Sequence, residues 1–168
     1  MFMENEWLYF PLFFSLEHKK VLIVGGGKVG TRRAKALLPF CKHITVVSLE
    51  FSKELIKIVR KENRITLIKA PFRADQLKNP FFVLAATNSE SVNEEIVAEC
   101  RKREIFVNHG GDKAQCDFYF PGIVRKGSLV LGVTSGGREH KEVKDMTYWL
   151  QRRLDNGEFD TTKKAKDI

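Results

Sequence analysis

The sequence contains few cysteines and lacks any long hydrophobic run. Its three cysteines, Cys41, Cys100 and Cys116, are far apart and form no Cys-x-x-Cys pair. Such spacing argues against a disulfide framework or a thiolate zinc site and favours a reducing, cytoplasmic setting. The apolar opening MFMENEWLYFPLFFSL begins with acidic residues and is interrupted by Pro11, unlike a signal peptide. No apolar run approaches membrane-spanning length, so we expect no membrane partner.

Acidic residues are scarce relative to basic ones. The 29 lysines and arginines exceed the 21 aspartates and glutamates, which gives a formal net charge of +8. This excess favours an anionic partner, such as a nucleic acid, a membrane surface, or a polycarboxylate or phosphate ligand. The sequence carries no recognised nucleic-acid-binding motif, so we do not expect a nucleic acid to be that partner. With 43% hydrophobic residues, the chain is able to bury a core.

Short apolar segments alternate with helical patterns through most of the chain. The expected strands, rich in Val, Ile, Leu or Phe, are Lys20–Val24, Ile44–Val47, Ile65–Ile68, Phe82–Ala85 and Ile105–Val107. The expected helical segments are Val29–Leu38, Ser52–Lys61, Ala74–Leu77 and Ser91–Arg103. In the last helix, the spacing places Val92 and Ile96 on the buried side and Asn93 on the outer side. Continuous apolar strands separated by helices predict βαβ units and a parallel sheet covered on both faces.

Three consecutive glycines stand where the first expected strand turns into a helix, in VLIVGGGKVGTRRA. They include the pattern Gly25-x-Gly27-x-x-Gly30. In a dinucleotide-binding turn, the first glycine allows the tight turn, the second lets backbone N–H groups reach a pyrophosphate, and the third lets the helix pack close. A purely structural turn is the alternative. The position at the first strand–helix junction favours a dinucleotide site that includes Lys28 and Val29.

The end of the second expected strand is the expected site for the adenosine half of the cofactor. An acidic residue there often binds the ribose hydroxyls of NAD. This strand ends in Ser48, Leu49 and Glu50, and no arginine follows at once to hold a 2′-phosphate. The sequence therefore favours NAD over NADP.

The ends of the fourth and fifth strands supply the expected site for the nicotinamide half. Thr87 and Asn88 follow two alanines at the carboxyl edge of the predicted sheet, and Asn108 ends the next strand. Small residues followed by polar ones suit a loop beneath a cofactor, although an ordinary turn would explain them equally well.

After the fifth strand the pattern becomes β-rich. The segment HGGDKAQ reads as a turn, and Phe118–Val124 and Leu129–Thr134 read as the strands of a hairpin. An amphipathic helix follows, with Trp149 on its apolar side. Because a lone hairpin is marginally stable, we expect it to pair with a second chain or to pack on this helix. The predicted fold is α/β: a Rossmann-type NAD-binding domain over residues 1–112, then a dimerisation hairpin and C-terminal helix over residues 113–168.

Read together and in order, the glycine turn, AATNSESVN, VNHGGDKAQCDFYFPGIV and LVLGVTSGG resemble one family. From about Phe10 to about Gly137 the chain is similar to precorrin-2 dehydrogenases, the N-terminal NAD-dependent module of siroheme synthases. The resemblance implies oxidation of precorrin-2 to sirohydrochlorin, a tetrapyrrole step of siroheme biosynthesis, by a homodimer. Some members also insert Fe²⁺ into sirohydrochlorin, so the resemblance implies iron as a second partner.

The chain departs from this family at its acid/base position. The loop after the fifth strand of the family carries an aspartate where this chain has Gly111, and Asp112 follows one place later. Either Asp112 moves the proton from a shifted loop, or His109 does so, or neither does. In the last case the chain is a non-catalytic carrier or sensor of nucleotide or tetrapyrrole.

The resemblance also implies a site for the carboxylate-rich substrate. Ser135 matches a serine near the tetrapyrrole pocket of the family. After Ser135-Gly136-Gly137 the family commonly continues with Ser-Pro, whereas this chain has Arg138, Glu139 and His140. Arg138 and Lys113 are the basic residues that we expect to bind substrate carboxylates. We expect no resident metal site.

Overall fold

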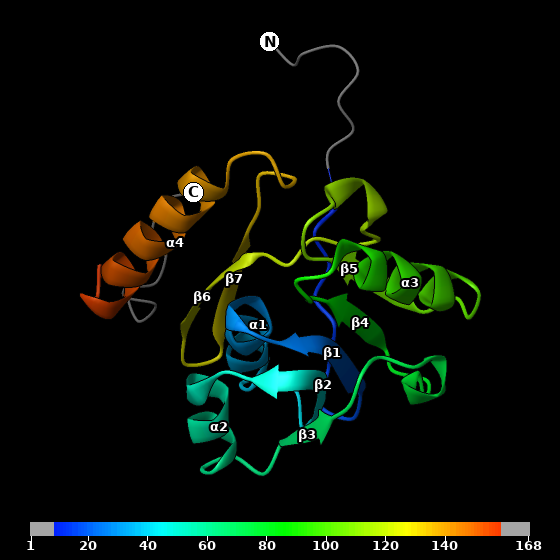
Figure 1. The fold of residues 1–168 in the computed structure, drawn as a ribbon. Helices are drawn as coiled ribbons and strands as arrows, with labels where there is room; N and C mark the ends of the chain where they lie inside the picture. Colours follow the sequence, from blue (N-terminus) through cyan, green and yellow to red (C-terminus); the bar gives the residue numbers. More distant parts are fainter. Residues whose placement is uncertain (1–8, 159–168) are drawn as a thin grey trace, which may run out of the picture. The chain divides into compact units, whose positions relative to one another are not determined.

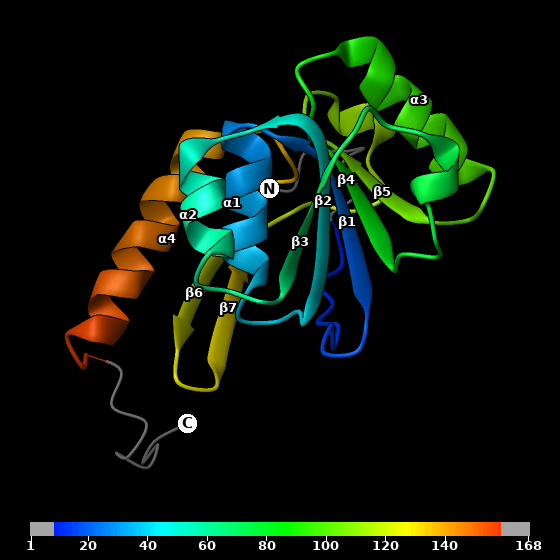
Figure 2. The same ribbon diagram turned by 60° about the horizontal axis from the view of Figure 1, so that its bottom comes forward.

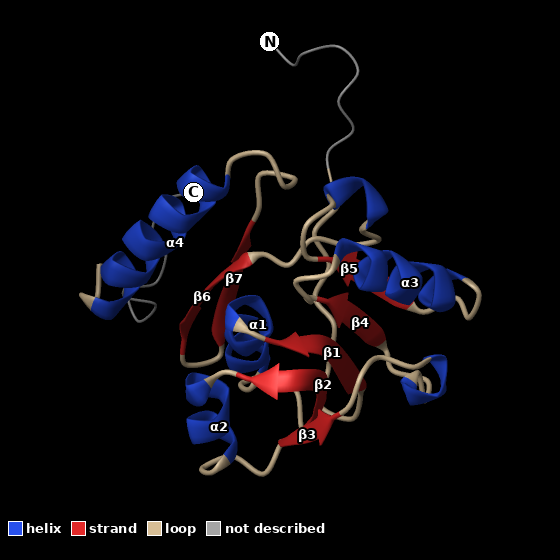
Figure 3. Cartoon of the chain, viewed as in Figure 1, coloured by secondary structure: helices blue, strands red, loops and turns tan. Residues whose placement is uncertain are grey.

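The computed structural model describes residues 9–158 (Figure 1). The elements, in chain order, are β1 (Lys20–Gly26), α1 (Lys28–Leu37), β2 (His43–Phe51), α2 (Lys53–Val59), β3 (Ile65–Lys69), the 3₁₀ turn η1 (Ala74–Gln76), β4 (Phe82–Ala85), α3 (Glu90–Arg101), β5 (Phe106–His109), the 3₁₀ turn η2 (Lys113–Gln115), β6 (Gly122–Lys126), β7 (Leu129–Val133) and α4 (His140–Asp155). Strands and helices alternate up to β5 (Figure 3). The α/β fold predicted from the sequence is confirmed.

The first five strands form one parallel sheet in the order β3-β2-β1-β4-β5. Strand β1 lies at its centre, where Ile23 pairs with Val46 of β2 on one side and with Leu84 of β4 on the other. The side chains from Val21 to Val24 are all buried, because helices cover both faces of the sheet. The strand order reverses between β1 and β4, and the carboxyl ends beside such a reversal are where open α/β sheets bind ligands.

Helices α1 and α2 lie on one face of the sheet and α3 lies on the other (Figure 2). Two of the three begin at serines that cap backbone N–H groups: Ser52 Oγ accepts from Leu55 N at 3.0 Å, and Ser89 Oγ accepts from Val92 N at 3.4 Å. Helix α1 begins instead at Gly27, which has no capping side chain. Its N-terminus is therefore the one of the three left without a side-chain acceptor.

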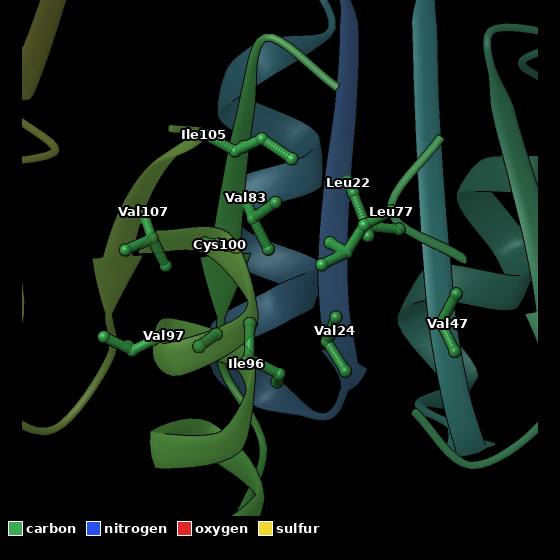
Figure 4. Close-up of a cluster of buried hydrophobic side chains, with 11 residues drawn as sticks. Leu22, Val24, Val47, Leu77, Val83, Ile96, Val97, Cys100, Ile105 and Val107 are labelled. Carbon is green, nitrogen blue, oxygen red and sulfur yellow. The ribbon is translucent and has the colours of Figure 1, made fainter. Parts of the chain in front are cut away.

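Helix α3 covers β1, β4 and β5 with an apolar cluster (Figure 4). Its side of the cluster consists of Ile96, Val97 and Cys100, all at most 1% exposed. The prediction that Asn93 faces outward is wrong, since this residue is 5% exposed. Its polar side chain is buried because it has partners in the loop after β4, described below.

The described residues form two compact units, one of residues 13–118 and one that joins residues 9–12 to residues 119–158. The sequence had placed the division after residue 112. The intervening segment is tied back to β5: Val107 N donates to Asp117 Oδ2, and Asp117 N donates to Val107 O, at 2.8 and 2.9 Å.

In the second unit, β6 and β7 form an antiparallel hairpin against α4. The first strand of the hairpin was predicted over 118–124, but β6 begins at Gly122. Pro121 precedes it, and proline has no N–H group to donate to a neighbouring strand. A Cβ on Gly122 would lie 2.2 Å from Thr147 Oγ1, so glycine lets α4 approach the strand. Trp149 is 49% exposed and stacks against Arg153.

Every helix in residues 9–158 is too short or too polar to cross a membrane.

Candidate active site

Three loops lie side by side at the carboxyl edge of the sheet: the glycine loop (residues 25–30), the β4 loop (residues 86–89) and the β5 loop (residues 109–117). Backbone hydrogen bonds join them, since Ala86 N donates to Val24 O and Gly110 N donates to Ala85 O, both at 2.8 Å. The elements predicted to carry the cofactor are thus adjacent at the reversal of strand order.

The glycine loop is tightly packed at two of the three motif positions. Gly25 has φ +118°, and a Cβ there would lie 2.2 Å from Ala86 O. A Cβ on Gly30 would lie 1.8 Å from Gly25 O, so this glycine lets α1 pack on the turn. A Cβ on Gly27 would meet nothing within 4 Å. Packing therefore requires Gly25 and Gly30, whereas Gly27 faces open space.

The start of α1 suits an anion. It has no acidic residue in its first turn, and its first residue is Lys28. The buried Thr31 fixes this end, because its Oγ1 donates to Gly27 O at 2.7 Å and lies 2.8 Å from Ser52 Oγ at the start of α2. A helix N-terminus with an open glycine in front of it fits the pyrophosphate of a dinucleotide.

The end of β2 continues further than predicted, to Phe51, because it pairs with Gly26 of the glycine loop. A Cβ on Gly26 would lie 2.5 Å from Glu50 O and 3.1 Å from Ser48 Cβ. Gly26 is not part of the Gly-x-Gly-x-x-Gly motif, but its lack of a side chain lets β2 approach the glycine loop. Ser48 is consequently placed against the glycine loop, while the side chains of Leu49 and Glu50 are exposed.

The β4 loop is held by Asn93 of α3, a residue that sequence reasoning missed. Its Oδ1 accepts from Thr87 N at 3.1 Å and from Thr87 Oγ1 at 2.7 Å, and its Nδ2 donates to Thr87 O at 3.2 Å. All of the polar groups of Thr87 are thus fixed. Asn88, the next residue, is exposed at the same edge.

The β5 loop is closed around the sulfur of Cys116, which sequence reasoning also missed. Its Sγ accepts from His109 N at 3.2 Å and lies 3.3 Å from Asp112 O. Asn108 closes the loop from the other side, since its Nδ2 donates to Phe118 O at 2.8 Å. The amide of Asn108 therefore shapes the loop in this structure.

His109 was predicted to lie in a turn, but it is the last residue of β5 and is 6% exposed. Its Nδ1 accepts from Gly111 N at 3.0 Å and from Asp112 N at 2.8 Å. Its Nε2 is buried and has no hydrogen-bond partner within the described part of the chain. The imidazole thus faces its own loop.

Asp112 caps the short turn η2 and stays close to the carboxyl edge. Its Oδ1 accepts from Ala114 N at 2.8 Å and its Oδ2 accepts from Gln115 Nε2 at 3.1 Å. The bond from Gln115 and the bond from Ala114 lower the pKa of this carboxyl group.

The two glycines before Asp112 do not adopt the left-handed backbone conformation, because neither Gly110 nor Gly111 has a positive φ. The shift of the aspartate by one place therefore does not depend on that conformation. Gly110 instead allows a close approach, since a Cβ there would lie 3.0 Å from Ala85 O.

Arg33 is a half-buried cation on α1 that lies near the β5 loop. Burial and, to a smaller extent, the neighbouring Arg32 lower the pKa of Arg33 to about 10, and Cys116 acts in the opposite direction. Arg33 remains charged at neutral pH, and the effect of Cys116 places its charge near the β5 loop.

The remaining predicted residues fall in different units. Lys113 begins η2 and is exposed. Ser135 and Arg138 share the turn between β7 and α4, where Ser135 Oγ accepts from Glu139 N at 2.9 Å and Arg138 N donates to Ser135 O at 3.4 Å. Within residues 9–158, no group of three or more His, Cys, Asp or Glu side chains is placed to hold a metal ion.

Known proteins resemble this chain in both sequence and structure. Residues 12–122 match the family model of NAD(P)-binding domains. The siroheme synthase of Pseudoalteromonas translucida (strain TAC 125) is 40% identical over 129 residues, which are 77% of this chain and 27% of that protein. The siroheme synthase of Mannheimia succiniciproducens is 35% identical over the same shares of both chains. This chain thus spans about a quarter of the length of the curated relatives it matches.

Among solved structures, the precorrin-2 dehydrogenase SirC superposes with a TM-score of 0.74 at 27% identity. The match covers 86% of this chain and 70% of that one. The match thus includes the nucleotide-binding fold and part of the segment that follows it. The chain therefore belongs to the NAD(P)-binding family of precorrin-2 dehydrogenase and of the matching part of siroheme synthases.

Proposed function

We propose that this chain oxidises precorrin-2 to sirohydrochlorin with NAD⁺ as the hydride acceptor, as a step of siroheme biosynthesis. The observation that carries the proposal is the open face of Gly27 at the start of α1, on the same sheet edge as the carboxylate of Asp112. The family of the chain supports it. Formation of NADH and sirohydrochlorin from precorrin-2 and NAD⁺ tests it.

The reaction removes a hydride and a proton from the tetrapyrrole. NAD⁺, when bound, accepts the hydride. The residues of the chain have two tasks: to hold the two reactants against each other at the sheet edge, and to accept the proton. The glycine loop and the fixed β4 loop perform the first task, because their hydrogen bonds leave them little freedom.

We assign the proton to Asp112. Each oxygen of an ionised carboxylate can accept two hydrogen bonds, and each oxygen of Asp112 accepts one in the structure. The group is ionised at neutral pH, in the state that accepts a proton, and its lowered pKa makes it a weaker base than an ordinary aspartate. His109 is the weaker candidate, since the single lone pair of its Nδ1 already accepts two N–H groups.

We assign recognition of the substrate carboxylates to basic residues around the edge. Arg33 is the strongest candidate for this role, because a desolvated cation attracts a carboxylate more strongly than an exposed cation does. Lys113, which is exposed at the start of η2, is the second candidate in this unit. Ser135 and Arg138 belong to the other unit and stay predictions that follow from the resemblance. The resemblance further implies iron insertion, and adding Fe²⁺ to the same assay tests it through formation of siroheme.

We expect the enzyme to prefer NAD⁺ to NADP⁺ by about tenfold or more in kcat/KM, which is about 1.4 kcal/mol. Glu50 is the residue before the last of β2 and lies beside the glycine loop, where its exposed carboxylate would bind ribose hydroxyls and repel a 2′-phosphate. Steady-state kinetics with both cofactors measure the ratio. Glu50→Gln narrows it, whereas Glu54→Gln, which removes an exposed partner of Lys35, leaves it unchanged. A wild-type preference for NADP⁺ contradicts this assignment.

We also propose that the chain is a homodimer formed through β6, β7 and α4. The hairpin has two strands, and its large apolar residues Leu129, Met146 and Trp149 are each at least 42% exposed. Sedimentation equilibrium at micromolar concentration is expected to give about twice the 19.3 kDa of one chain. A mass of 19.3 kDa refutes the dimer.

A further inference from the structure

The imidazole of His109 has its two nitrogens in very different positions. Nδ1 lies 3.0 Å from Gly111 N and 2.8 Å from Asp112 N, and both of these backbone groups are donors. A ring nitrogen that accepts hydrogen bonds carries no proton, so the neutral ring holds its proton on Nε2. The backbone of the loop therefore selects one tautomer of the ring.

Neither nitrogen is poised to exchange a proton with a substrate. Protonation of Nδ1 would turn an acceptor into a donor that faces two other donors. Nε2 is buried and has no partner among the described residues. Direct proton transfer by His109 would thus require the loop to open.

The same contacts couple the ring to Asp112. The N–H of Asp112 bonds to the ring, its carboxylate caps η2, and its carbonyl oxygen lies 3.3 Å from Cys116 Sγ. Cys116 in turn accepts from His109 N. Loss of the ring acceptor therefore removes two of the bonds that hold this backbone, those from Gly111 N and Asp112 N.

We infer that His109 is a positioning residue, whose unprotonated Nδ1 holds residues 109–112 in the conformation that places Asp112. The inference rests on the proposed function for its effect on turnover, but its structural part is independent of the reaction. This role gives a reason for the histidine that stands three residues before the displaced aspartate. The ring supplies the acceptor that shapes the shifted loop.

Two side chains that mimic different ends of the ring provide the test. Asn places an amide oxygen near the position of Nδ1, while Gln places its amide near the position of Nε2. We expect His109→Leu and His109→Gln to lower kcat by about tenfold, within the range for a displaced catalytic group, with NAD⁺ affinity retained. His109→Asn is expected to restore most of that loss. Equal damage by Asn and Leu, or no damage by Leu, overturns the inference.

Two measurements decide the structural part, whether or not the chain turns over precorrin-2. Long-range ¹H–¹⁵N NMR of the wild type is expected to show Nδ1 unprotonated and Nε2 protonated, and a protonated Nδ1 in the neutral ring overturns the inference. Amide hydrogen exchange at Gly111 and Asp112 is expected to be slow in the wild type and in His109→Asn, and fast in His109→Leu. A wild type that fails to oxidise precorrin-2 but passes both measurements refutes the proposed function alone.

Discussion

Replacing Asp112 with Asn is expected to lower the turnover of precorrin-2 by about 10² to 10⁴-fold, the usual contribution of positioned proton transfer. The amide keeps the shape of the side chain and an oxygen that can cap Ala114 N. It cannot take a proton from the substrate. Because the glycine loop is untouched, the affinity for NAD⁺ is expected to stay at its wild-type value, and calorimetry checks this in the same preparation.

Asp75 offers a matched control for this experiment. It also lies in a 3₁₀ turn, and its carboxylate pairs with Arg73 at an exposed position in the connection between β3 and β4. Asp75→Asn should therefore leave turnover unchanged. His109→Ala should lower turnover less than Asp112→Asn does, since the ring acts through the loop. The reverse order, with Asp112→Asn silent, would assign the proton to His109.

Replacing Gly27 with Val is expected to weaken NAD⁺ binding at least tenfold, about 1.4 kcal/mol. The new side chain has no protein atom within 4 Å of its Cβ position, and Gly27 has φ −78°, which any residue can adopt. The protein should therefore fold normally, while the side chain occupies the space that the pyrophosphate approaches. Titration calorimetry gives the affinity, and thermal unfolding shows that the fold is retained.

Gly30→Ala is the contrasting variant. Its Cβ would lie 1.8 Å from Gly25 O, so it should lower the unfolding temperature by displacing α1 from the turn. The two variants thus separate a ligand-facing glycine from a packing glycine. Unchanged NAD⁺ affinity in a folded Gly27→Val protein would remove the glycine loop from the binding site.

The centre of the sheet was predictable because burial on both faces leaves a plain signal in sequence. The run from Val21 to Val24 and the run from Phe82 to Ala85 are uninterrupted and apolar, and both are strands in the structure. The glycine turn was predictable for a similar reason, since close backbone approach at Gly25 and Gly30 excludes every larger residue.

The β5 loop was not predictable from periodicity. Its shape comes from side chains that bond to backbone groups several residues away, such as Cys116 to His109 N and Asp117 to Val107 N. These contacts follow no repeat of 2 or 3.6 residues. The burial of Asn93 was missed for the same reason, because helical spacing gives a direction but not the presence of Thr87 as a polar partner.

The most direct test of the account is a turnover assay with precorrin-2 and NAD⁺ on the wild-type chain and Asp112→Asn side by side. We expect the wild type to form NADH and sirohydrochlorin in equal amounts. We expect the variant to bind NAD⁺ with the same affinity but to form both products at least about 10²-fold more slowly. A wild type that binds NAD⁺ and sirohydrochlorin but forms no NADH would contradict the account and identify the chain as a carrier or sensor.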